Sequence, residues 1–108
     1  MPAYVIGWLD VDDWKWLRAY QPPTARLIAK HGGSYRVRGG LMERLEGEDP
    51  LPGAFVVLEF PTREAARAWY EDPEYGPLIR LRREHARTEL VLVDGITDAL
   101  GLDPGSAR

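Results

Sequence analysis

Two arginines and a glutamate lie in neighbouring predicted strands of this chain, and their charges suit binding of an anion or transfer of a proton. Arg36 and Arg38 stand two positions apart in the segment KHGGSYRVRGG, and Glu59 interrupts the apolar run AFVVLEF. Alternate residues of a strand point to the same face, so we expect both guanidinium groups on one side of the sheet. A hairpin that turns near residues 47–52 would bring Glu59 opposite one of the two arginines.

The resulting arginine–carboxylate pair supports two hypotheses. In a cavity between helices and sheet, or inside a closed barrel, Arg36 and Arg38 would hold an anionic ligand and orient Glu59 as a catalytic, proton-transferring group. The alternative is a cross-strand salt bridge at a sheet edge, with no part in chemistry. Glu59 is expected to have a partner in either case, because an unpaired carboxylate in a central strand is costly.

His31 is a second candidate catalytic residue, and it lies between a predicted helix and two glycines. Its ring titrates near neutral pH, which suits a general base or a hydrogen-bond donor in the same pocket. The alternative is a structural cation at a helix C-terminus, where the helix dipole favours positive charge.

Aromatic residues surround a predicted break between two helices. Trp69 and Tyr75 bracket Asp72 and Pro73 and are candidate ligand-binding walls for an aromatic or planar molecule. The alternative is ordinary core packing, because aromatic side chains contribute much of the buried area of a small domain.

Several classes of site are not expected. The two histidines are far apart and cysteine is absent, so the sequence predicts no metal site, disulfide or thiol catalysis. Neither glycine pair, 32–33 or 39–40, precedes a helix N-terminus, so neither is expected to cradle a phosphate. The arginines of residues 80–87, Arg82 among them, are interleaved with acids and are expected to form a solvent-exposed face.

The spacing of apolar residues predicts the elements that position these side chains. Strands are expected over residues 3–11, 35–45, 54–60 and 88–95. Helical segments are expected over residues 13–21, 23–31, 62–71 and 77–85. Pro22 and Pro23 predict a break between the first two helical segments, and Thr62 is the expected N-cap of the third.

The order of these elements favours an α+β, ferredoxin-like βαββαβ fold, in which a four-stranded antiparallel sheet carries its helices on one face. Residues 1–95 are expected to form this domain, and residues 96–108 a C-terminal tail that is loose or docked on a neighbour. The strand over residues 3–11 is apolar on both faces, which indicates cover on both. Because helices cover only one face, we expect a homodimer through the other.

The segments AYVIGWLDV, IAKHGGSYRVRGG, VVLEFPTREAARAWYEDPEY and ELVLVDG resemble a family of small bacterial proteins known as domain of unknown function 1330, over residues 2–95. The resemblance implies membership of the dimeric α/β-barrel superfamily, but no activity. Superfamily relatives include cofactor-free quinone-forming monooxygenases, haem-degrading enzymes and muconolactone isomerases. Trp14 and Trp16 depart from the family pattern and are expected to alter a pocket mouth or the dimer contact.

The composition restricts the partners of the chain. It has 108 residues and a formal net charge of −3, which argues against non-specific binding of nucleic acid. No apolar run is long enough to span a bilayer and no signal peptide is expected, so we predict a cytoplasmic protein without membrane contact.

These features predict a small-molecule binder or a cofactor-free enzyme, with a pocket between sheet and helices and a small organic acid or aromatic compound as ligand. The residues leave open whether the protein is an enzyme. The alternative is a non-catalytic dimerisation module whose charged residues only stabilise the sheet. No cofactor is expected in either case.

Overall fold

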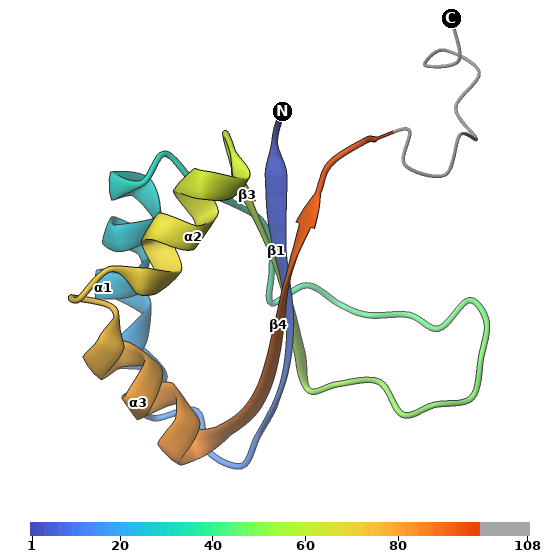
Figure 1. Ribbon diagram of the computed structural model, residues 1–108. Coiled ribbons are helices and arrows are strands. Elements are labelled where there is room, and N and C mark those ends of the chain that lie inside the picture. Colours follow the sequence, from blue (N-terminus) through green and yellow to red (C-terminus); the bar gives the residue numbers. More distant parts are fainter. Residues whose placement is uncertain (98–108) are drawn as a thin grey trace, which may run out of the picture.

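The computed structural model describes residues 1–97, and its secondary structure follows the predicted order. One antiparallel sheet, in the order β2-β3-β1-β4, contains the strands β1 (Ala3–Val11), β2 (Ser34–Arg38), β3 (Ala54–Phe60) and β4 (Ala86–Asp94). One side of this sheet carries the helices α1 (Leu17–Lys30), α2 (Arg63–Glu71) and α3 (Gly76–His85) (Figure 1). This is the predicted ferredoxin-like α+β arrangement. Of the predicted tail, residues 98–108 lie outside the described part of the chain.

The central strand β1 shows how the sheet presents two different faces. Ala3 and Val5 point toward the helices and are buried. Tyr4, Ile6 and Trp8 alternate with them and therefore point to the face that no helix covers, here termed the open face (Figure 1). By strand register the open face carries the apolar side chains of Ile6, Trp8, Val37, Phe55, Val57, Val91 and Val93.

The hydrophobic core lies between the helices and the other face of the sheet. At its centre the rings of Phe60 and Trp69 lie 5.5 Å apart, and both residues are fully buried. The helix that carries Trp69 begins as predicted, because the Thr62 hydroxyl accepts a hydrogen bond from the Ala65 N–H at 3.0 Å. Among the described residues, no helix has both the length and the apolar character needed to cross a membrane.

Helix α1 differs from the prediction of two segments, because it continues through Pro22 and Pro23. The fixed φ of proline fits a helix, although each proline removes one N–H donor. Packing outweighs this loss, since Leu27 and Ile28 after the prolines are buried in the core and Tyr20 before them packs against it. The helix also begins later than predicted, at Leu17, and Asp13 instead accepts a hydrogen bond in the preceding turn. Trp16 therefore stands at its N-terminus, buried in the domain.

Strand β2 is shorter than predicted. It ends at Arg38 because Gly39 adopts a φ of 67°, a left-handed conformation that takes the chain out of the sheet. Residues 39–53 then form a connection without helix or strand, which projects from the sheet on the side away from the helices (Figure 1). Two of its side chains, Leu41 and Leu45, are 99% and 94% exposed. This connection is termed the arm.

Gly33 provides a test of how tightly the core is packed. A Cβ at this position would lie 2.5 Å from Cε1 of Phe60, a fully buried ring. We expect Gly33→Ala to lower the free energy of unfolding by about 1–3 kcal/mol, as overpacked cores do. Urea denaturation followed by circular dichroism measures this change. Gly40→Ala is the control, because a Cβ there meets no atom within 4 Å; equal losses for the two variants would contradict such tight packing around Phe60.

Candidate functional site

Arg36 and Arg38 do not share a face of β2, so that prediction is wrong. The register of β2 on β3 shifts between Tyr35 and Val37, which leaves Arg36 as the extra residue of a β-bulge. Arg36 reaches Glu59 across the open face, with Nε 3.2 Å from Oε1. Arg38 instead turns to the helix side, where its guanidinium carbon lies 4.7 Å from the centroid of the Tyr35 ring.

The predicted contact between Arg36 and Glu59 is present, but it does not lie between helices and sheet. The other expected location, inside a closed barrel, and the alternative of a purely structural salt bridge stay predictions. Glu59 follows the buried Leu58 in β3 and therefore points to the open face. The hydrogen bond from Arg36, supported by one from Tyr4, lowers the pKa of the Glu59 carboxyl group. The hydrogen bond between Tyr4 and Glu59 also raises the pKa of Tyr4, which lies opposite Glu59 in the pairing of β1 with β3. Glu59 is thus a carboxylate at neutral pH and only a weak base.

His31 lies apart from both Glu59 and Arg38, at the C-terminal end of α1. Its Nε2 atom is 2.8 Å from Oδ2 of Asp72, and Nζ of Lys30 is 2.9 Å from the same oxygen. Asp72 lies in the turn between α2 and α3, so these contacts connect the C-terminal end of α1 to that turn. The predicted grouping of His31, Glu59 and Arg38 in one pocket is therefore not found.

The carboxylate of Asp72 predicts a specific dependence of stability on pH. Hydrogen bonds from His31, Lys30 and the Glu74 N–H lower its pKa in the folded chain. A lowered folded-state pKa contributes stability that is fully present above the unfolded pKa, about 3.9, and is lost as the pH falls below it. We expect Asp72→Asn to be less stable than the unmodified chain at pH 7, and the difference to narrow from about pH 4 downward.

Urea denaturation at pH 7, 5 and 3 measures this difference. Glu71→Gln is the matched control, because this neighbouring glutamate is exposed and has no ion pair among the described residues. It should change stability little at any of these pH values. If the difference in free energy of unfolding between Asp72→Asn and the unmodified chain grew toward pH 3, the pH trend would be the reverse of the expected one and would contradict a lowered pKa of Asp72.

A cavity of about 410 Å³, termed the interior cavity, lies between the helices and the sheet. Three of the predicted ligand-binding residues, Arg38, Trp69 and Tyr75, line it. Trp14 and Trp16 also line it, so the tryptophan-rich segment contributes to a pocket, one of the two effects expected of it. Its volume falls within the range of small-molecule sites, and most of its walls are aliphatic or aromatic.

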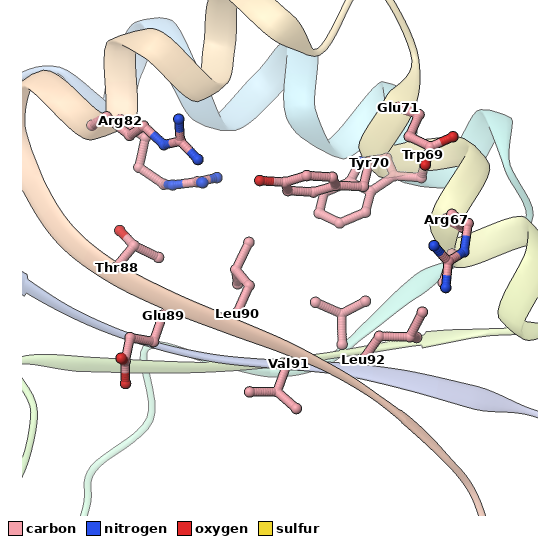
Figure 2. A pocket seen from close by; sticks show the side chains of 13 residues that line it. Arg67, Trp69, Tyr70, Glu71, Arg82, Thr88, Glu89, Leu90, Val91 and Leu92 are labelled. Atoms are coloured by element: carbon pink, nitrogen blue, oxygen red, sulfur yellow. The ribbon is translucent and has the colours of Figure 1, made fainter.

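A second cavity, of about 720 Å³ and termed the edge cavity, lies between β4 and the helices α2 and α3 (Figure 2). It shares Trp69, Arg82 and Leu90 with the interior cavity, so the two spaces adjoin. In Figure 2, Thr88 and Leu90 point from β4 into the edge cavity, whereas Glu89 points away from it. The carboxylate of Glu89 therefore faces the open side of the sheet.

A hydrogen-bonded group of two tyrosines and an arginine lines the interior cavity. Nη1 of Arg82 donates to the Tyr75 hydroxyl at 2.7 Å and to the Tyr20 hydroxyl at 3.1 Å. The two hydroxyl oxygens lie 2.5 Å apart. Burial raises the pKa of Tyr75, so its hydroxyl stays protonated near neutral pH. These three side chains are termed the tyrosine–arginine group.

The burial of Arg82 overturns the prediction that it belongs to a solvent-exposed basic face. Its neighbours Arg80 and Arg83 are exposed as predicted, but Arg82 is only 4% exposed. The spacing of Tyr75, Ile79 and Arg82, four and then three residues apart, places all three on the inner face of α3. That helical spacing is the signal in the sequence that Arg82 faces the core. The charged residues on either side of Arg82 made this pattern hard to recognise.

Residues that have buried polar atoms without a hydrogen-bond partner border both cavities. Within residues 1–97 these atoms are Nε of Arg82, Nε1 of Trp16 and Trp69, and Oγ1 of Thr24 and Thr88. Each of these five residues borders the interior cavity, the edge cavity or both. Buried polar groups are normally hydrogen-bonded, so their gathering around one space indicates that the space receives a polar ligand or water.

Solved structures from several bacteria are similar in fold. A protein of unknown function from Rhodopseudomonas palustris is 16% identical with a TM-score of 0.71, and the match covers 89% of this chain and 83% of that one. SnoaB, a cofactor-independent oxygenase from Streptomyces nogalater, is 16% identical with a TM-score of 0.63, and the match covers 89% of this chain and 94% of SnoaB. A dimeric protein of unknown function with a ferredoxin-like fold, from Bacteroides fragilis, is 13% identical with a TM-score of 0.53 and coverage of 87% and 96%.

At these identities the likeness establishes the fold and nothing about activity. No curated protein matches the chain. The sequence does match a family profile over residues 2–96, which is most of its length and includes every strand and helix from β1 to β4. The chain therefore belongs to the family described as domain of unknown function, DUF1330.

Proposed function

We propose that the chain binds a small, largely apolar molecule, an organic acid or an aromatic compound, in the interior cavity. The observation that carries the proposal is the set of residues with unpartnered buried polar atoms that border this cavity and the edge cavity. Apolar walls with a few convergent polar groups are typical of ligand pockets. Of the residues predicted to bind a ligand, Arg38, Trp69 and Tyr75 belong to this site.

The walls suit a flat molecule. The rings of Trp69 and Tyr75 lie 4.6 Å apart and form a continuous aromatic surface. The hydroxyl of Tyr35, which also lines the cavity, accepts a hydrogen bond from Nε2 of Gln21 at 2.9 Å, and this bond fixes the ring in place. Arg38 lies over the Tyr35 ring. A planar ligand would meet aromatic surface on more than one side.

The proposal is for binding rather than for catalysis. Glu59 and His31, the groups predicted to be catalytic, do not line the interior cavity, and Glu59 is already neutralised by Arg36. The similarity to SnoaB, a cofactor-independent oxygenase, supports a small-molecule site that needs no cofactor. It does not supply a reaction for this chain.

The neutral compound 2-naphthamide tests the proposal by isothermal titration calorimetry. We expect saturable binding and a rise in melting temperature. Ala54→Phe should weaken binding about tenfold or more, because Ala54 lines the cavity and a phenyl ring there would fill part of it. Ala68→Phe, on the exposed side of α2, is the control and should bind normally. The proposal fails if the unmodified chain shows no saturable binding of 2-naphthamide or of its anionic analogue 2-naphthoate, or if the two variants bind alike.

We also propose that the chain forms a homodimer through its open face. Val91 and Val93 on this face are 47% and 40% exposed, and the similar protein from Bacteroides fragilis is described as dimeric. The arm projects on the same side of the sheet, so Leu41 and Leu45 would pack on the second copy (Figure 1). In the alternative of a non-catalytic dimerisation module this contact would be the whole function, and 2-naphthamide would not bind.

A further inference from the structure

Within the described part of the chain, the interior cavity is lined by two arginines whose positive charge no carboxylate in the cavity balances. Arg38 and Arg82 line the cavity, but no aspartate or glutamate does so among the described residues. Arg82 forms no ion pair within residues 1–97, although it is 4% exposed. A guanidinium group stays protonated even when it is buried, and a buried charge without a counter-charge is strongly unfavourable. A bound anion would supply the missing charge.

The glutamates that border the edge cavity together with Arg82 do not fill this role. Glu71 and Glu89 border the edge cavity, and Glu89 points away from it (Figure 2). The groups that accept hydrogen bonds from Arg82 are instead the hydroxyls of Tyr75 and Tyr20. A neutral hydroxyl solvates a guanidinium group without balancing its charge.

The tyrosine–arginine group contains more hydrogen-bond donors than acceptors. Nη1 of Arg82 serves both hydroxyl oxygens, and only one hydroxyl proton can lie between those oxygens. The other hydroxyl proton has no acceptor among residues 1–97, and neither has Nε of Arg82. The indole Nε1 atoms of Trp16 and Trp69 are two further buried donors without an acceptor. A surplus of donors selects a ligand group that only accepts, and an ionised carboxylate is such a group.

The position of Arg82 also indicates how such a ligand would lie. Its Nη1 atom is occupied by the tyrosines, whereas Nε has no hydrogen-bond partner, so the Nε side of the guanidinium fork is where a carboxylate would find an unused donor. The remaining walls are mainly aliphatic and aromatic. A ligand that satisfies both features has one anionic group and a flat, apolar body.

We infer that the interior cavity binds an organic monoanion, a carboxylate on a planar apolar body, and that Arg82 is the residue that binds its charged group. The inference rests on the proposed function and names the ligand class of the same site. Arg38, which is exposed at the end of β2, is not required for the charge selectivity.

A matched pair of probes tests this inference by calorimetry at pH 7. 2-Naphthoate and 2-naphthamide share one shape, and only the first carries a charge. We expect the unmodified chain to bind 2-naphthoate about 10- to 100-fold more tightly, as a charge-assisted contact in a buried site allows. Arg82→Met should lose this preference, so that its affinities for the two probes become nearly equal. Arg80→Met removes the same charge from the exposed side of α3 and should keep the preference.

The outcomes separate this inference from the proposed function. Binding of both probes with equal affinity would overturn the anion inference and leave the proposed function standing, whereas binding of neither would remove both. A preference for 2-naphthoate that survived in Arg82→Met would assign the anion to another residue and overturn the role of Arg82. If Arg82→Met does not fold, Arg82→Lys keeps the charge and should retain a preference for 2-naphthoate; equal binding of both probes would contradict the inference.

Discussion

Replacing Trp69 by alanine is expected to lower the free energy of unfolding by about 3–5 kcal/mol, the range found for large aromatic residues removed from protein cores. Trp69 is 2% exposed and packs against Phe60 and Tyr75, with ring centroids 5.5 Å and 4.6 Å away. It also lines both cavities, so its loss would enlarge a space that is already open. A domain of this size has little stability to spare, and the variant should be close to unfolding at 37 °C.

Guanidinium denaturation followed by far-ultraviolet circular dichroism measures this loss, at one protein concentration throughout, because dimerisation would add to the apparent stability. Trp14→Ala is the matched control. It removes the same side chain from a position that is 45% exposed, so the loss should be well below that of Trp69→Ala. Equal losses would mean that Trp69 is not the central residue of the hydrophobic core.

The second large effect concerns the oligomeric state. Val57 lies on the open face at the middle of the sheet, opposite Ile6 of β1 and Val37 of β2. In a face-to-face dimer a lysine at this position would place a charge within an apolar interface, which is strongly unfavourable. We expect Val57→Lys to convert a homodimer into a folded monomer at micromolar concentrations.

Sedimentation equilibrium measures this change, and circular dichroism establishes that the variant is folded. Ala68→Lys adds the same charge on the exposed surface of α2, on the helical side of the domain, and should remain dimeric. A monomeric unmodified chain, or a Val57→Lys variant that stayed dimeric, would contradict the proposed use of the open face.

Much of the fold follows from local patterns in the sequence. The run of residues 54–60 combines high strand propensity with flanking turn residues, and the strand is found with those bounds. Thr62 has the side chain of an N-cap and caps α2. In each case a short segment contains the information that determines its conformation.

Features that depend on contacts between distant segments were predicted less well. Pro22 and Pro23 predict a break from local propensity, but the packing of α1 on the sheet keeps one continuous helix. The β-bulge at Arg36 arises where β2 pairs with β3, and this single extra residue moves Arg38 to the opposite face. Strand alternation alone cannot reveal such a shift, because one residue of slippage reverses every face that follows it.

The candidate site was predicted only in part, for the same reason. Trp69 and Tyr75 were identified as walls because of their type, and both line the interior cavity. Arg82 was assigned to solvent because three other arginines lie within residues 80–87. Its burial depends on Tyr20, which lies 62 positions earlier and whose hydroxyl accepts a hydrogen bond from Arg82. A charged residue is predicted to be exposed until the distant partner that solvates it is known.

The most direct test of the central claim, that an unbalanced buried guanidinium group forms the anion-binding centre of the cavity, is the NMR signal of the Arg82 Nε–H group. The signal can be assigned by its absence from the spectrum of Arg82→Lys. On titration with 2-naphthoate it should move downfield in a saturable manner, because the free Nε–H acquires a carboxylate acceptor, while 2-naphthamide should produce a much smaller change. A signal that stayed in place while 2-naphthoate bound would show that the anion is held elsewhere.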